Sequence, residues 1–122
     1  LGLVGSEMCI RDSHWPSEWQ RGVLDLCVLH ILADGPTYGY SIAARLTDAG
    51  FADVKGGTLY PLLKRLEGAG LVDVEWRPGE AGPGRKFYLI NTAGRQRLIA
   101  LTASWQRYST TVTRLLDEGS LS

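Results

Sequence analysis

The stretch with the clearest potential for chemistry runs from Gly56 to Gly70, GGTLYPLLKRLEGAG. Tyr60, Lys64 and Glu67 project onto the side of a helix opposite to its apolar residues, with Thr58 and Arg65 on one flank. Hydroxyl and ammonium donors on such a face suit the acceptor atoms of DNA base edges. An ordinary solvated face fits this pattern almost equally well. The apolar residues, spaced as one buried helical face, are Leu59, Leu62, Leu63 and Leu66.

Pro61 lies near the front of this expected helix, where it needs an explanation because proline has no N–H to donate. The first four N–H groups of a helix have no partner within it. If the helix begins near Gly57 or Thr58, Pro61 falls among these groups and costs little. Its fixed φ then stiffens the end of the helix that a DNA-reading segment presents to the bases.

Other chemistries find little support in the residues. Two cysteines, Cys9 and Cys27, and two histidines, His14 and His30, are too few and too scattered for a zinc site. No glycine-rich phosphate loop and no Ser–His or Cys–His signature is present. We therefore expect no enzyme activity, no cofactor and no metal. We expect Cys27 to be a reduced core thiol and His30 a packed, hydrogen-bonded side chain.

Composition describes an ordinary globular chain of 122 residues, with 44% hydrophobic and 21% charged residues. No apolar run is long enough to span a membrane, and we expect a cytoplasmic protein. The zero net charge hides an uneven distribution, because residues 55–90 carry six basic and four acidic groups. A weak basic bias of this kind is compatible with DNA binding and does not establish it.

The first thirteen residues, LGLVGSEMCIRDS, show no helical or alternating periodicity. They are too short, with the wrong flanks, for a secretory signal peptide. They resemble the translated read-through of a sequencing adaptor, and we expect residues 1–13 to be a non-native or disordered leader.

Two helices and a hairpin surround the opening stretch. Residues 17–33 are nearly all helix-compatible and, from residue 23 on, mostly apolar. Residues 38–50 give a second short helix after the turn DGPT, with Thr37 as its cap. After Gly70, LVDVEWR and KFYLIN alternate as strands about the loop PGEAGPGR. We predict a mainly α fold with a small β-hairpin, a winged helix-turn-helix over residues 14–91.

Residues 92–122 predict a long last helix, with Thr92 as its cap. Apolar residues recur along it with the alternating 3 and 4 spacing of a heptad seam, which packs against another helix. A chain this small cannot cover the whole seam, so we expect a homodimer held by this helix. The seam consists of Leu98, Leu101, Trp105, Tyr108, Val112 and Leu115.

Three segments, YGYSIAARL, GGTLYPLLKRLEGAGLV and GPGRKFYLINTAG, resemble in this order the signature segments of the PadR family of bacterial transcriptional regulators. The likeness extends from about Trp19 to Leu116. With its one expected C-terminal helix, the chain resembles the shorter subfamily. It implies a winged-helix homodimer that binds double-stranded DNA, in most members as a repressor. The chain departs from the family at Lys55 and Gly56, where relatives often have Ser followed by Pro or Glu, so the usual helix cap is missing.

The resemblance also implies roles for single residues. Tyr60 and Lys64 match groove-facing positions, Arg85 and Lys86 match the basic wing, and Tyr38 matches a residue near the DNA backbone. The full set expected to contact DNA is Tyr38, Lys55, Thr58, Tyr60, Lys64, Arg65, Arg85 and Lys86.

Trp105 has two interpretations. Its seam position makes it interface packing by default, but in some short PadR relatives a tryptophan at this place lines a pore and stacks on flat drugs. A planar aromatic effector is therefore a hypothesis for this chain. The rival to a DNA-binding function is a winged helix that binds protein without specific DNA binding, which the zero net charge slightly favours.

Overall fold

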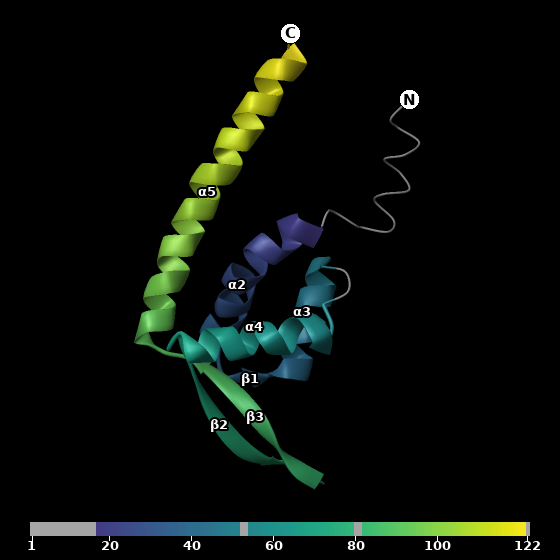
Figure 1. Cartoon of the computed structure of the whole chain (residues 1–122), viewed down its shortest axis with the longest axis vertical. Helices are drawn as coiled ribbons and strands as arrows, with labels where there is room; N and C mark the ends of the chain where they lie inside the picture. The colour runs from purple at the N-terminus through teal and green to yellow at the C-terminus, as the bar shows by residue number, and fades with distance from the viewer. Residues whose placement is uncertain (1–16, 52–53, 80–81, 122) are drawn as a thin grey trace.

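The computed structural model describes residues 17–51, 54–79 and 82–121; the leader 1–13 and the start of the expected 14–91 domain lie outside them. Four helices and a small sheet make up the described fold (Figure 1). The elements are α2 (Ser17–Ala33), β1 (Thr37–Tyr38), α3 (Gly39–Ala49), α4 (Gly56–Gly68), β2 (Val72–Gly79), β3 (Gly82–Ile90) and α5 (Thr92–Leu121).

The core forms where α2 meets α3, α4 and the sheet. α2 is apolar on most sides, and it contacts α3, β3 and α5. The four leucines of α4 are all buried, as their spacing predicts, and apart from Tyr88 every buried side chain among the described residues is aliphatic. The core thus fixes the side of α4 that faces inward and, by elimination, the sides that face out.

The sheet has three antiparallel strands in the order β1-β3-β2. The sequence predicted only the hairpin, because β1 is two residues long and exists through its pairing of Tyr38 with Phe87. Thr37 is accordingly part of a strand and not a helix cap; Tyr38 occupies the cap position of α3 with no side-chain cap bond. At the other end of α3, Gly50 adopts a left-handed φ of 111°, as expected for a glycine stop.

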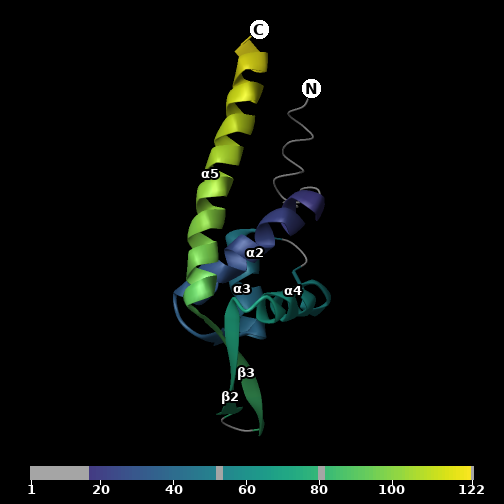
Figure 2. The same ribbon diagram turned by 60° about the vertical axis from the view of Figure 1, so that its left-hand side comes forward.

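The hairpin β2–β3 extends beyond the helices on one side of the molecule, and α5 rises beyond them on the other (Figures 1 and 2). This reach corrects one expectation. Val72 and Val74 pack inward as the alternation predicts, but Trp76 is 69% exposed because the hairpin has passed the edge of the core by that point. The projecting part of the hairpin is the wing.

Asn91 fixes the start of α5, a role that we expected for Thr92. Its side-chain oxygen accepts a hydrogen bond from the Gly94 N–H at 2.8 Å, and its amide donates to the Gly70 carbonyl at 2.9 Å. Gly94 packs so closely that an added Cβ would lie 2.1 Å from the carbonyl oxygen of Leu71. These contacts join α5 to the turn after α4, so the direction of α5 is set relative to α4.

Candidate nucleic-acid interface

α4 begins at Gly56, one or two residues earlier than expected, with Lys55 at its cap position and no side-chain cap bond. The Leu59 N–H already donates to the Lys55 carbonyl at 2.8 Å. Pro61 therefore lies inside the helix, where its missing N–H leaves the Gly57 carbonyl without a helical partner. Our expectation that Pro61 falls among the free N–H groups was wrong; both Gly57 and Pro61 are exposed, so water or a ligand can satisfy that carbonyl.

Tyr60 lies on the flank of α4 that faces the start of α3. A Cβ added to Gly39 would be 2.6 Å from the Tyr60 hydroxyl oxygen, so the ring rests against the bare backbone of that glycine. The side chain is still 52% exposed. Tyr60 is thus a held side chain whose outer edge reaches solvent, and not the free outward residue that the projection suggested.

Arg65 lies on the opposite flank of α4 and forms an ion pair with Asp25 of α2 at 2.5 Å. We placed Arg65 in the DNA-contact set, and the structure gives its guanidinium a partner within the protein. Both side chains remain partly open to solvent, so this pair contributes little to stability.

The outermost side of α4 lies between these two flanks. At 100° per residue it carries Gly57, Pro61, Lys64 and Gly68, all of them exposed. Three of these residues are glycine or proline and project little from the helix, so Lys64 is the one long side chain of the four. We call this surface the smooth outer strip of α4. Thr58 and Lys55 are exposed at the N-terminal end of the same helix.

Arg85 and Lys86 are neighbours in the sequence but point to opposite faces of the wing, because side chains alternate along a strand. Lys86 shares its face with the buried Tyr88, and its ammonium lies 3.6 Å from the Glu67 carboxylate of α4. Burial raises the pKa of the Tyr88 hydroxyl, and the Lys86 charge partly opposes that shift. Lys86 thus connects the wing to α4.

Arg85 lies on the other face of the wing with Tyr38, for which the family resemblance implied a place near the DNA backbone. Three further residues of this face were not selected from the sequence: Glu75, Arg77 and Phe87. The Arg85 guanidinium sits 4.6 Å above the Tyr38 ring, and that ring packs against Phe87 at 5.4 Å. Arg77 covers the Phe87 ring at 4.4 Å and donates to Glu75 at 2.5 Å. The signal for Arg77 was its even spacing from Asp73 and Glu75 on the strand, which indicates the outer face.

The seam of α5 is divided between two environments. Leu98 and Leu101 pack against the core of their own chain. Trp105 is 44% exposed and Leu115 67%. Both follow Leu101 along α5, and Figure 1 shows that the later part of this helix rises away from the domain. The remaining seam residues, Tyr108 and Val112, are exposed as well.

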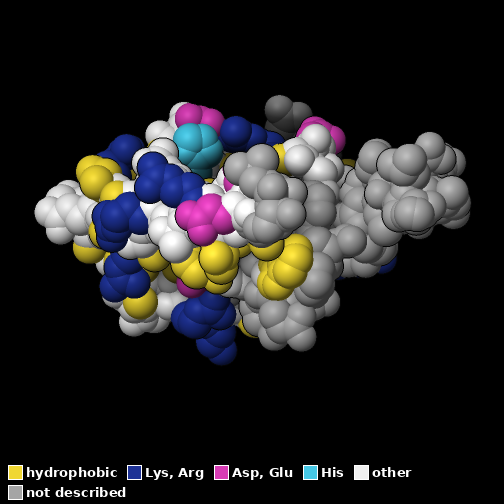
Figure 3. Space-filling model, turned by 90° about the horizontal axis from the view of Figure 1, so that it is seen from above, with side chains coloured by type: hydrophobic (Ala, Val, Ile, Leu, Met, Phe, Trp, Pro, Cys, Tyr) yellow, Lys and Arg dark blue, Asp and Glu magenta, His cyan; other side chains and the backbone are white. Residues whose placement is uncertain are grey.

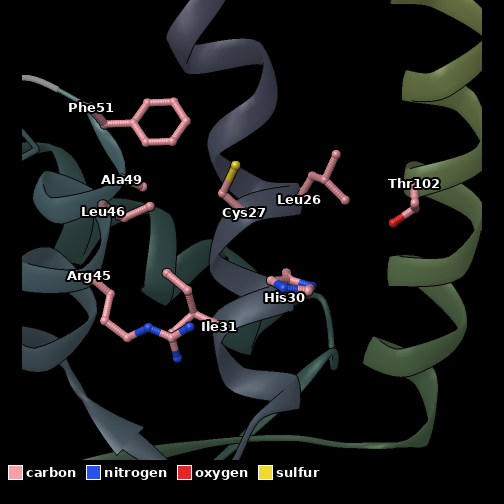
Figure 4. Close-up of a pocket in the computed structure, with 9 residues that line it drawn as sticks. All are labelled: Leu26, Cys27, His30, Ile31, Arg45, Leu46, Ala49, Phe51 and Thr102. Atoms are coloured by element: carbon pink, nitrogen blue, oxygen red, sulfur yellow. The ribbon is translucent and has the colours of Figure 1, made fainter.

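A cavity of about 330 Å³ lies between α2, α3 and the first half of α5 (Figure 4). Its wall is largely apolar, and burial raises the pKa of the Cys27 thiol that lines it, as suits a reduced, packed cysteine. His30 is exposed at this cavity, which corrects our expectation of a packed histidine. The lining residues are Leu26, Cys27, His30, Ile31, Arg45, Leu46, Ala49, Phe51 and Thr102.

Figure 3 views the molecule from the end where α5 terminates. The described side chains on this face are basic, acidic and apolar, with several basic groups toward one side. No described helix is long and apolar enough to cross a bilayer. No group of three potential metal ligands occurs within residues 17–51, 54–79 and 82–121.

Comparison with known proteins identifies this architecture. The model of the transcriptional regulator PadR-like family matches residues 28–100. The chain belongs to the PadR family. Members of this family regulate transcription and are not enzymes.

Individual relatives agree with this assignment. The chain is 40% identical to transcriptional regulator Rv3488 of Mycobacterium tuberculosis over 81 residues, which are 66% of this chain and 74% of that protein. A PadR-like regulator from Bacillus cereus superposes with a TM-score of 0.74 at 36% identity, covering 81% of this chain and 96% of the other. A PadR family regulator from Eggerthella lenta gives a TM-score of 0.74 at 34% identity, covering 93% of this chain and 92% of the other.

Among the solved structures that resemble the chain is a PadR protein bound to DNA. Bacillus subtilis PadR in complex with operator DNA superposes with a TM-score of 0.61 at 26% identity. The match covers 66% of this chain and 45% of that larger one. The shared part confirms the winged-helix fold.

Proposed function

We propose that this PadR-family regulator is a homodimeric repressor that binds operator DNA through α4 and the wing and releases it when a planar aromatic molecule binds. The observation that carries the DNA-binding part is the placement of the exposed basic groups. Lys64 and Arg85 are exposed on α4 and on β3 of the wing. These two elements lie on the side of the molecule opposite to the C-terminal half of α5 (Figure 1). A dimer formed through α5 then presents two such sides to one DNA duplex.

Base contacts are assigned to Thr58, Tyr60 and Lys64. The smooth outer strip of α4 permits close approach to the floor of the major groove, where guanine and adenine expose acceptors. Because Tyr60 is held against Gly39, its hydroxyl loses little conformational freedom on binding.

Phosphate contacts are assigned to Lys55, Arg85 and Lys86, with Tyr38 beneath Arg85. Arg65 joins them only if it leaves Asp25, which lowers its expected contribution. The same holds for Lys86 and Glu67, since the carboxylate competes with phosphate for the ammonium.

Dimerisation is assigned to the exposed half of the α5 seam. A helix with large apolar side chains exposed over several turns needs a partner, and an identical helix supplies a matching seam. Two-fold symmetry then sets the spacing of two α4 helices, which must match half-sites about 34 Å apart. A dimer bound over a promoter blocks access of the polymerase, which gives repression.

Trp105 is assigned to the effector site. It lies at the boundary between the packed and exposed halves of α5 and contacts Tyr108 at a ring-centroid distance of 6.4 Å. Two copies of this aromatic pair near the dimer axis offer flat surfaces for a planar ligand.

The test is DNA binding measured by fluorescence anisotropy at two salt concentrations, with the duplex upstream of the protein's own gene and a random duplex. We expect tighter binding to the first and a steep loss of affinity for both as salt rises. Tyr60→Phe and Lys64→Gln should lower the preference for the upstream duplex by roughly 1–3 kcal/mol. Binding that does not depend on salt, or no binding, would instead favour the protein-binding winged helix.

A further inference from the structure

The outer face of the wing carries two arginines that are held in one arrangement. Arg77 and Arg85 are direct cross-strand partners, so their side chains leave the same face of the hairpin. Tyr38 and Phe87 are likewise partners, on β1 and β3. Each guanidinium lies over one ring of this aromatic pair, Arg77 over Phe87 and Arg85 over Tyr38.

We propose that Arg77 and Arg85 act together as a phosphate-binding pair on the outer face of the wing, positioned by the rings of Tyr38 and Phe87. The ligand is the sugar-phosphate backbone of DNA, so the inference rests on the proposed DNA binding. It adds a residue, Arg77, that neither the family resemblance nor the sequence pattern assigned.

The chemistry of the pair suits phosphate. A guanidinium stacked on a ring keeps its in-plane N–H donors free to point sideways, and these donors match phosphate oxygens in fork geometry. Arg77 uses its Nε–H for Glu75, which leaves its terminal N–H groups. Arg85 has no hydrogen-bonded or ion-paired partner among the described residues, which exclude positions 80 and 81 of the wing tip.

The basic groups are divided between the two faces of the wing, and this division supports a wing that lies along a groove of DNA. Lys86 lies on the face toward α4, and the arginine pair lies on the outer face. A two-stranded ribbon that lies along a DNA groove has a phosphate backbone on each side. Each face of this wing then meets one backbone, and the aromatic pair prevents the two arginines from spreading into solvent before contact.

Glu75 makes the proposal testable. If Arg77 only supports the wing, its ion pair with Glu75 is useful, and Glu75→Gln should weaken DNA binding as Arg77→Gln does. If Arg77 contacts phosphate, Glu75 competes with DNA for the guanidinium, and Glu75→Gln should strengthen binding.

The experiment measures the affinity of the full chain for a labelled random-sequence duplex from about 50 to about 200 mM salt. Each of Arg77→Gln and Arg85→Gln should reduce the slope of log affinity against log salt by about 0.9, and the double variant by about twice that. Phe87→Leu keeps both charges and should keep the slope while lowering affinity. Arg114→Gln, on α5 far from the wing, is the control for loss of one positive charge and should leave the slope unchanged.

The outcomes separate the two levels of inference. If the wild type binds DNA in a salt-dependent way and Arg77→Gln does not change the slope of log affinity against log salt, the proposed phosphate-binding pair is overturned. The proposed function then remains intact. Equal losses in Glu75→Gln and Arg77→Gln would overturn the pair as well. A wild-type protein without salt-dependent DNA binding would overturn the proposed function and, with it, the pair.

Discussion

The two halves of α5 carry one apolar pattern and have different surroundings. Leu98 and Leu101 in the first half pack on the core of the chain, whereas Leu115 in the second half is exposed. A heptad seam therefore predicts that a helix packs against another part of the structure, but it does not tell whether that part belongs to the same chain or to a second one. The difference divides α5 into a half that serves folding and a half proposed to serve association.

The largest expected effect comes from the exposed half. Leu115→Asp places a charge in the proposed dimer contact, where it would be buried without a partner. We expect a folded monomer with at least about a hundredfold weaker binding to a two-half-site duplex, since each subunit then binds alone. Sedimentation at micromolar concentration and far-ultraviolet circular dichroism measure both properties. A dimeric variant would show that the contact lies elsewhere.

The packed half should respond in the opposite way. Leu101→Ala removes apolar contacts with the core and should lower the free energy of unfolding by about 2 kcal/mol, with little change in dimer affinity beyond that. Urea unfolding of Leu101→Ala and Leu115→Ala side by side tests the comparison. The prediction that Leu98 and Leu101 lie in the dimer interface would be supported if Leu101→Ala weakened the dimer without destabilising the subunit.

Local periodicity explains what the sequence predicted well. The buried side of α4 follows from leucine spacing alone, and the wing follows from alternation about a glycine- and proline-rich loop. Both patterns depend on residues that are close in the sequence, so they can be recognised without knowledge of the rest of the chain.

Contacts between distant segments explain what the sequence did not predict. β1 exists because Tyr38 pairs with Phe87, about fifty positions later in the chain. Arg65 meets Asp25 across a separation of 40 residues, and no local rule could identify that pair. The stacking of Arg77 on Phe87 likewise depends on strand register, which the loop between β2 and β3 left open.

Trp105 lies where the two halves of α5 meet, and a substitution there tests whether this boundary binds the proposed effector. Ligand and DNA that favour different dimer geometries oppose each other with a coupling of roughly 1–3 kcal/mol, equal in both directions. We expect a flat aromatic dye to weaken DNA binding of the wild type by about tenfold. Trp105→Ala should abolish this effect and the quenching of tryptophan fluorescence while the dimer persists. Unchanged dye binding in that variant would leave Trp105 as packing only; Trp19 and Trp76, both 69% exposed, make the comparison between variants necessary.

The smallest expected effect concerns the joint from which both halves of α5 extend. Asn91→Ala removes the oxygen that caps α5 and the amide that binds the Gly70 carbonyl, and should cost about 1 kcal/mol of unfolding free energy. Thr92→Ala is the matched control: Thr92 is exposed and makes no cap bond in the described structure, so its change should stay within about 0.5 kcal/mol.

Because Asn91 ties α5 to the turn after α4, its loss should also loosen the angle between the dimer helix and the proposed reading helix. DNA affinity should then fall by more than the stability change alone explains, since fewer dimers hold both α4 helices at the half-site spacing. Equal stability losses in Asn91→Ala and Thr92→Ala would show that the cap does not fix the start of α5.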